Sequence, residues 1–273
     1  MPHAVINGAR LWYEVRGAGE PILLHHGYTA SRVNWAPVAD RLEDRFQVIL
    51  MECRGTGASE HTADGYSLDQ YAADVVGLLD HLGLRKATYA GHSMGGGIGY
   101  RLALDYPERV ERLVLMAPIP ADGIGPIDPA MRAERLAERR RKDRDALLAR
   151  YVAMRFRPDV ETDAWFEDRV RHILSVSDGH FEQSAESMTA LAVGERLAEI
   201  RLPTLMIAGA VDGLLPANLA DFQRLPNATL EVLSRAGHEV AVHEPDRVAE
   251  AIASFMAHGP VTAASLMARL ASG

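Results

Sequence analysis

Hydrophobic and polar residues along the chain follow two alternating patterns. Short runs that are apolar nearly throughout are typical of strands covered on both faces of a sheet. These runs occupy residues 11–17, 21–27, 46–52, 86–93, 110–117, 203–210 and 228–234. Between them, apolar residues recur every three to four positions, which predicts amphipathic helices. The alternation predicts an α/β fold with a mostly parallel sheet and helices on both of its faces.

Three of the predicted helices have recognisable ends. One begins after Ser67, a favourable N-cap residue, and stops at Gly83. The second starts at Met94 and ends before Pro107, because the residue that precedes a proline avoids the helical conformation. The last main helix carries Pro245 near its first turn.

The alternation is interrupted after the run at residues 110–117, where helical patterns follow one another without a strand between them. The simplest interpretation is a helical cap subdomain of residues 118–201, inserted into a core domain of residues 1–117 and 202–273.

A densely charged segment lies within this insertion, from Arg139 to Arg144. Carboxylates are interleaved with its arginines, so we interpret it as a solvated, self-paired helix face rather than a site for polyanions. The residues after His258 predict either a short docked helix or a frayed end.

The composition narrows the class of protein. The chain has 273 residues, 48% of them hydrophobic, which is enough for a large core. Its formal net charge of -8 gives no general attraction for polyanions, so we expect no nucleic-acid partner. The single cysteine, Cys53, excludes an intramolecular disulfide and a cysteine metal cluster.

We see neither a signal-peptide pattern nor an apolar run near the roughly 20 residues of a membrane span, and expect a cytoplasmic protein without a membrane partner. Homo-oligomerisation stays open.

One serine is surrounded by glycines. The stretch "GHSMG", from Gly91 to Gly95, matches the pattern G-x-S-x-G, which arises by chance in about one chain of this length in ten. Here a β-run precedes the serine and a helical pattern follows it, which is the context of a nucleophile elbow. The tight turn would expose the Oγ of Ser93, and the start of the following helix would favour negative charge beside it. We therefore predict that Ser93 is a nucleophile.

A serine nucleophile needs a base, normally a histidine that is oriented by a carboxylate. We predict His238, which lies directly after the last β-run and follows Gly237. His243 is the alternative base, although it falls where the last helix begins. His92 lies inside the elbow turn, and we expect a structural role with its side chain directed away from the Ser93 oxygen.

The predicted carboxylate is Asp212, in the loop that follows the strand before the His238 strand. Neighbouring parallel strands would bring both loops to one edge of the sheet. A simpler interpretation is that Asp212 only caps the helix near Pro216. Asp122 is the alternative acid, but it lies several residues into the insertion.

The oxyanion of an acyl-transfer intermediate needs two N–H donors. We predict the backbone N–H groups of Met94 and of Tyr28, the latter in the loop "HHGYTAS". We expect the side chains of His25 and His26 to brace this loop. No metal-binding spacing appears in the sequence, so no metal is expected.

These segments resemble the α/β-hydrolase fold superfamily. The resemblance rests on "HHGYTAS", "CRGTGAS", "GHSMGG", "AGAVDGLLP" and "AGHEVAVHEP", which occur in the order of that family and span almost the whole chain. It implies the catalytic order Ser93, Asp212 and His238, a helical cap after the strand that follows the elbow helix, and no cofactor. The family often has aspartate where this chain has Glu52, a departure expected to change local bracing only.

The resemblance also implies two-step acyl transfer on a small-molecule, ester-like substrate. Relatives that open epoxides or displace halide use an aspartate nucleophile, so Ser93 argues against both reactions. Our primary hypothesis is hydrolysis of carboxylic esters with small or medium acyl groups. Cleavage of carbon–carbon bonds in diketones, hydrolysis of lactones or amides, and cofactor-free peracid formation stay open, and a non-catalytic ligand receptor is the distant alternative.

Apolar residues of the cap would form pocket walls or its own core: Met154, Phe156, Trp165, Phe166, Ile173 and Leu174.

Overall fold

The computed structural model describes residues 2–126 and 128–272 and contains one eight-stranded sheet. Its strands are β1 (His3–Ile6), β2 (Ala9–Arg16), β3 (Pro21–His25), β4 (Gln47–Met51), β5 (Ala87–His92), β6 (Val110–Met116), β7 (Thr204–Gly209) and β8 (Ala228–Leu233). Their spatial order is β1-β2-β4-β3-β5-β6-β7-β8. The pairs from β4 to β8 are parallel, whereas β1 and β2 run antiparallel to their neighbours. The mostly parallel sheet that the alternation predicts is confirmed.

The first strand, β1, was not predicted. It forms a hairpin with β2 through Asn7 and Gly8, whose φ angles are 46° and 76°. Positive φ at both central positions is typical of a two-residue hairpin turn, for which Asn-Gly is a favoured sequence. The dipeptide was therefore the signal that could have located this strand.

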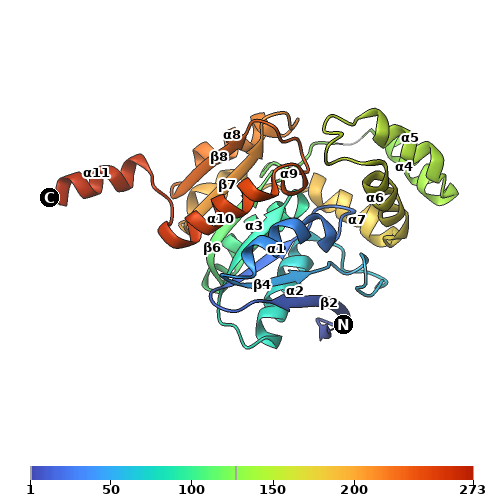
Figure 1. The fold of residues 1–273 in the computed structure, drawn as a ribbon. Coiled ribbons are helices and arrows are strands. Elements are labelled where there is room, and N and C mark those ends of the chain that lie inside the picture. Colours follow the sequence, from blue (N-terminus) through green and yellow to red (C-terminus); the bar gives the residue numbers. More distant parts are fainter. Residues whose placement is uncertain (1, 127, 273) are drawn as a thin grey trace.

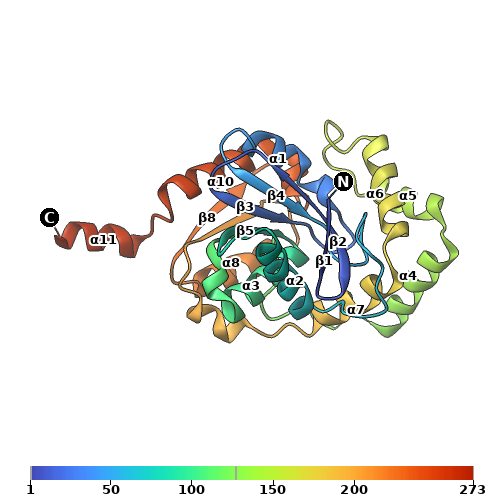
Figure 2. The ribbon, with the colours of Figure 1, turned by 90° about the horizontal axis from the view of Figure 1, so that it is seen from below.

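Helices cover both faces of the sheet (Figures 1 and 2). One face carries α1 (Ala36–Leu42), the short α9 (Val240–His243) and α10 (Pro245–His258), and the opposite face carries α2 (Leu68–His81), α3 (Met94–Asp105) and α8 (Leu215–Arg224). Short 3-10 helices occur at η1 (Arg32–Asn34) and η2 (Pro107–Arg109). Each face has its own hydrophobic core, so the sheet is buried on both sides.

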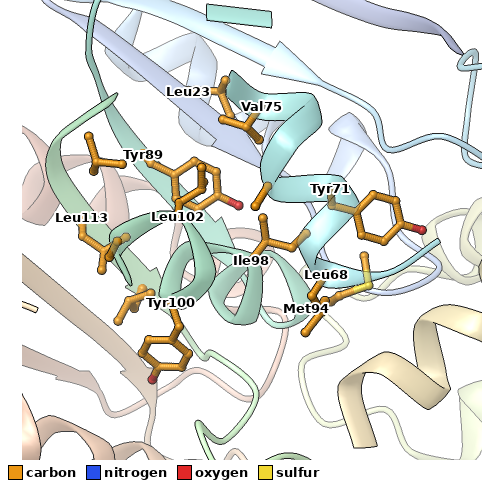
Figure 3. Packing of buried hydrophobic residues seen from close by; sticks show 14 of the residues in the cluster. Leu23, Leu68, Tyr71, Val75, Tyr89, Met94, Ile98, Tyr100, Leu102 and Leu113 are labelled. Atoms are coloured by element: carbon orange, nitrogen blue, oxygen red, sulfur yellow. The ribbon is translucent and has the colours of Figure 1, made fainter. Parts of the chain in front are cut away.

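The ends of α2 and α3 agree with the sequence signals. The Ser67 hydroxyl accepts the N–H of Gln70 at 3.1 Å, and Gly83 has a φ of 68° just beyond the helix. Figure 3 shows Val75 of α2 and Ile98 and Leu102 of α3 packed between these helices and the sheet. This packing fixes the position of α3, and therefore of the turn that precedes it.

Residues 118–201, which we call the helical insertion, contain helices and loops but no strand within the described part of the chain. The helices are α4 (Pro129–Arg141), α5 (Arg144–Ala153), α6 (Asp163–Ser175), α7 (Asp178–Thr189) and the 3-10 helix η3 (Gly194–Glu199). A left-handed residue, Lys142, with a φ of 53°, separates α4 from α5. Figure 1 shows α4 to α7 gathered at one end of the molecule.

The last helix, α11 (Ala263–Ser272), extends away from the rest of the molecule in Figures 1 and 2. Residues 263–272 thus form a helix that lies apart from the core in both views. Within residues 2–126 and 128–272, no helix combines the length and hydrophobicity needed to cross a bilayer.

Candidate active site

Ser93 lies in a sharp turn between β5 and α3. Its φ and ψ are 55° and -114°, a conformation that is uncommon and strained for a residue with a side chain. Four backbone hydrogen bonds hold it. The Ser93 N–H donates to Met116 O at 3.0 Å, and Ser93 O accepts the N–H groups of Gly96 at 2.9 Å, Gly97 at 3.2 Å and Ile119 at 3.1 Å. These hydrogen bonds to neighbouring backbone hold Ser93 in its strained conformation.

Two glycines make this turn sterically feasible. A Cβ atom at Gly91 would collide with the backbone carbonyl of Gly95, and one at Gly95 would lie 2.6 Å from His25 O. Because these contacts are with backbone, no side chain could move aside to relieve them. The glycines flanking Ser93 therefore allow neighbouring chain segments to approach closely.

The three residues predicted to react together lie within hydrogen-bonding distance of each other. The Ser93 hydroxyl is 2.9 Å from His238 Nε2, and His238 Nδ1 is 2.8 Å from Asp212 Oδ2. The loops after β5, β7 and β8 supply them at one edge of the sheet. Since a carboxylate only accepts hydrogen bonds, Nδ1 carries the proton and Nε2 is free to accept one from Ser93.

Asp212 orients His238 and braces the turn before α8, but it is not the N-cap of that helix, which is Leu214. Its side chain is 5% exposed, and its second oxygen, Oδ1, accepts the N–H of Leu214 at 3.0 Å just before α8. The residue therefore supports the start of α8 and orients the ring of His238. The alternative acid, Asp122, pairs at 2.8 Å with Arg224 at the surface and lies outside this arrangement.

The pairing shifts the pKa values of both partners. Burial lowers the pKa of His238, but the hydrogen bond and the negative charge of Asp212 outweigh it, so the pKa lies above its usual value. Burial raises the pKa of Asp212, and its interactions with His238 reverse this effect, so the net shift is downward. Both shifts favour a carboxylate beside an imidazole that gains a proton readily.

His92 has a contact that sequence reasoning missed. Its Nε2 donates to the backbone carbonyl of His238 at 2.8 Å, which is a structural contact of the kind expected for this residue. The two rings lie 4.9 Å apart between centroids. Burial lowers the pKa of His92 to about 4, so the ring is neutral near pH 7.

The alternative base, His243, is not at the site. It is buried, its Nδ1 accepts the N–H of Gly237 at 3.1 Å, and its Nε2 lies 3.1 Å from Glu161 Oε1. His243 thus supports the backbone that precedes His238 rather than reaching Ser93.

The loop between β3 and η1, residues 26–31, packs directly against the elbow. A Cβ atom at Gly27 would lie 2.9 Å from the Cβ of Ser93. The next N–H in this loop is that of Tyr28, and the N–H that follows the serine is that of Met94. Neither amide donates to another group within residues 2–126 and 128–272. The structure therefore leaves both predicted oxyanion donors without an internal acceptor.

The helical insertion holds this β3–η1 loop through four contacts. Arg169 donates to Thr29 O, His172 Nε2 donates to Ala30 O at 2.8 Å, and the Thr29 N–H donates to His180 Nε2 at 3.3 Å. The fourth is the Tyr28 hydroxyl, which donates to Phe181 O. All four partners come from α6 and α7, so the insertion fixes the loop that carries the Tyr28 N–H.

The core braces the same loop from the other side. His26 Nδ1 donates to Gly27 O at 2.8 Å and its Nε2 accepts the N–H of Cys53 at 3.1 Å, while His25 lies 2.7 Å from the Tyr89 hydroxyl. These contacts agree with the bracing role expected for both histidines.

Glu52 braces the neighbouring turn. It accepts the N–H of Ala58 at 2.7 Å and pairs with Arg32 at 2.8 Å. The glutamate thus acts locally, as expected.

Ser93 and His238 open onto a cavity of about 470 Å³ between the sheet edge and the helical insertion. Of the six apolar residues considered as walls, Met154 and Ile173 line it. Phe166 is buried in the insertion, and Phe156 packs against His243 at 4.8 Å between ring centroids. A cavity of this size can hold a small organic molecule.

The prediction of a solvated, self-paired segment holds for only part of the charged stretch. Arg140 pairs with Glu182, and Arg144 pairs with Asp145 and Glu167. Arg139 is instead buried and lines the cavity. Its guanidinium donates to the backbone carbonyls of Ile173 and Val176 at the end of α6, which holds the side chain inside the insertion. For Arg139, the solvated interpretation is wrong.

Comparison with known proteins gives consistent matches over nearly the whole chain. A family model described as "alpha/beta hydrolase fold" matches residues 20–245. A relative from Azorhizobium caulinodans, named "Putative carbamate hydrolase RutD", is 32% identical over 266 residues, which cover 93% of this chain and 98% of the relative. A 2-hydroxy-6-oxononadienedioate/2-hydroxy-6-oxononatrienedioate hydrolase from Burkholderia vietnamiensis is 30% identical over 270 residues, 90% of this chain and 91% of that protein. The solved enol-lactonase from Burkholderia xenovorans LB400 has a TM-score of 0.82 and 26% identity, covering 94% of this chain and 100% of that one.

Proposed function

Since this chain belongs to the α/β-hydrolase family and is a hydrolase, we propose that it cleaves carboxylic esters with small or medium acyl groups. The observation that carries the proposal is the continuous hydrogen-bonded chain from Ser93 Oγ through the ring of His238 to Asp212, at 2.9 and 2.8 Å. Residues 118–201 would serve as the cap over a core of residues 1–117 and 202–273.

In the proposed acylation, Ser93 Oγ forms a bond with the ester carbonyl carbon while its proton passes to His238 Nε2. The carbonyl oxygen becomes an oxyanion that accepts hydrogen bonds from the Tyr28 and Met94 N–H groups. His238 then donates its proton to the departing alkoxide, and the alcohol leaves. Loss of one oxyanion donor typically costs about 10²–10³-fold in kcat, so the position of the β3–η1 loop matters for the rate.

In the proposed deacylation, His238 takes a proton from water while the water oxygen attacks the acyl carbon. The bond to Ser93 Oγ breaks, the serine recovers its proton from His238, and the acid is released. Asp212 remains ionised throughout, holding the ring in the required tautomer and stabilising the imidazolium. Besides the substrate and one water molecule, the proposed steps use side chains and backbone groups of this chain.

The names of the relatives point to three other substrates: a carbamate, an oxo-dienedioate or oxo-trienedioate, and an enol-lactone, which is a cyclic ester. An ester, open-chain or cyclic, is the substrate that these groups serve with least additional chemistry, because its leaving oxygen needs one proton and His238 has just received one from Ser93. Carbon–carbon cleavage also needs a proton delivered to carbon. Specificity in one fold depends on pocket and loops, so the reaction is best distinguished by direct comparison of substrates.

The test is a panel of p-nitrophenyl acetate and butyrate, lactones, amides, carbamates and diketones, with Ser93→Ala as the control. We expect ester hydrolysis to have the highest kcat/KM and the substitution to remove it. Labelling of Ser93 by a fluorophosphonate, absent in Ser93→Ala, would show an activated serine independently of the substrate. Preferred turnover of another member of the panel would overturn the ester assignment, and an unreactive Ser93 would also overturn its role as nucleophile.

A further inference from the structure

We propose that the substrate carries a carboxylate at the far end of its acyl chain, and that Arg135 of α4 binds this group. The inference rests on the proposed ester hydrolysis, because it assigns a substrate class to the same cavity. It goes further by naming the charge of the substrate and the residue that recognises it.

The lining of the cavity is rich in arginine, although the chain has a formal net charge of -8. Five arginines of the helical insertion line it: Arg132, Arg135, Arg139, Arg150 and Arg169. Glu182 is the one carboxylate among its lining residues in the described parts of the chain. Lining charges of one sign raise the local concentration of oppositely charged ligands.

Four of the five guanidinium groups already have carboxylate partners outside the cavity lining. Arg139 pairs with Asp178 at 3.0 Å and Arg150 with Glu138 at 2.9 Å. Arg132 pairs with Glu186, and Arg169 lies 4.0 Å from Glu239. These ion pairs hold the four arginines in place and largely neutralise their charges.

Arg135 differs from the other four. It makes no hydrogen bond or ion pair with any residue in the ranges 2–126 and 128–272, yet it lines the cavity that also contains Ser93 and His238. Arg132, Arg135 and Arg139 are spaced by three and four residues, which places them on one face of α4. Arg135 is exposed, so its guanidinium is accessible to a ligand that enters the cavity.

The chemistry of the ligand follows from the lining. A guanidinium presents two parallel N–H donors that match the two oxygens of a carboxylate. Apolar side chains also line the cavity, including Leu136, Leu147, Ile173 and Met188. An acyl chain with a terminal carboxylate would bury its methylene groups against these apolar side chains. Its carboxylate would then pair with the guanidinium of Arg135.

The test compares two methyl esters of equal chain length, methyl hexanoate and monomethyl adipate. We expect wild-type kcat/KM to be about fivefold higher for the adipate ester, the scale of one partly exposed ion pair. Arg135→Gln should abolish this preference while changing kcat/KM for methyl hexanoate less than about twofold. Arg141→Gln is the matched control, because Arg141 is exposed on the same helix but does not line the cavity. The preference should also shrink in about 0.5 M NaCl, where charges are screened over a few ångströms.

Binding of the same two esters to the Ser93→Ala protein gives a readout that needs no turnover. Tighter binding of monomethyl adipate, lost in Ser93→Ala/Arg135→Gln and kept in Ser93→Ala/Arg141→Gln, supports the inference. Equal binding of the two esters overturns it, whatever the turnover results are. If neither ester is hydrolysed but the binding preference is present, ester hydrolysis fails while the carboxylate site stands.

Discussion

The ring of His92 donates a hydrogen bond to the backbone carbonyl of His238 at 2.8 Å. The residue before the predicted nucleophile thus holds the backbone of the predicted base. One contact couples the turn after β5 to the loop after β8, and helps keep Ser93 and His238 within reach of each other.

We predict that His92→Phe impairs catalysis without destabilising the fold. Phenylalanine keeps an aromatic ring but removes the hydrogen bond, and it also removes a buried Nδ1 atom that has no partner among the described residues. Because a hydrogen bond contributes about 0.5–1.5 kcal/mol, we expect kcat to fall by up to about tenfold with little change in KM. Thermal denaturation should show an unchanged or higher Tm. A wild-type kcat in the folded variant would contradict this positioning role.

We predict that the two candidate bases differ strongly on substitution. His238→Ala should lower kcat/KM for p-nitrophenyl butyrate by about 10⁴-fold or more, because Ser93 then lacks a proton acceptor. His243→Ala should lose at most about tenfold, since the ring of His243 hydrogen-bonds to the Gly237 N–H and the Glu161 carboxylate and packs against Phe156, away from the reacting groups. The reverse ranking would show that His243 is the base.

We predict that Asp212→Asn lowers kcat by about 10³–10⁴-fold, because asparagine cannot stabilise the imidazolium and favours the wrong tautomer. The raised pKa of His238 depends on Asp212, and activity needs a neutral ring. Activity should therefore rise with pH through this raised pKa, and the substitution should move the midpoint to lower pH. Asp122→Asn is the control, because it removes a surface pair with Arg224. An unchanged midpoint in Asp212→Asn would contradict the assignment.

We predict that His172→Ala lowers kcat by roughly tenfold, part of the effect of losing an oxyanion donor outright. The substitution removes the hydrogen bond from α6 to Ala30 O and loosens the β3–η1 loop beside Tyr28. Arg171→Ala, on the same helix, removes only an exposed pair with Asp168 and should keep wild-type kcat. Equal kcat values in the two variants would show that α6 does not support the loop.

We predict that the free energy of unfolding decreases as the pH falls from 6.5 to 4. Burial lowers the pKa of both His26 and His92 to about 4, whereas histidines in the unfolded chain titrate near 6.5. The unfolded state therefore binds more protons in this window, and each such histidine contributes a loss of about 1 kcal/mol per pH unit. His25, His172 and His180 are shifted in the same direction, whereas His238 acts in the opposite one.

Urea denaturation at several pH values measures this slope. His92→Phe should make it shallower, because that variant lacks one of the shifted groups. A free energy of unfolding that is constant between pH 6.5 and 4 would contradict the prediction.

The sequence predicted the parts of the site that depend on local constraints. Glycines around Ser93 and the strand–turn–helix context identified a conformation that few other residues permit. The positions of Asp212 and His238 followed from their loops, because neighbouring parallel strands end at the same edge of a sheet.

Contacts between distant segments were not predictable in the same way. Nothing in the pattern places His92 against the His238 carbonyl, or α6 against the β3–η1 loop, since both depend on how separate elements pack. The arginine face of α4 carried a signal, because Arg132, Arg135 and Arg139 have helical spacing. Its interleaved carboxylates nevertheless favoured a solvated interpretation, and only the packing of α4 over the cavity distinguishes the two.

The four contacts from α6 and α7 to the β3–η1 loop limit how this protein can be re-engineered. A chimera that receives the residue 118–201 segment of another protein would acquire a new pocket, but it would lose the side-chain anchors Arg169, His172 and His180. The contact of the Tyr28 hydroxyl would then depend on a backbone carbonyl at the position of Phe181. Grafts intended to change specificity should therefore retain these four contacts. Otherwise the β3–η1 loop loses its support and the catalytic rate of the chimera falls.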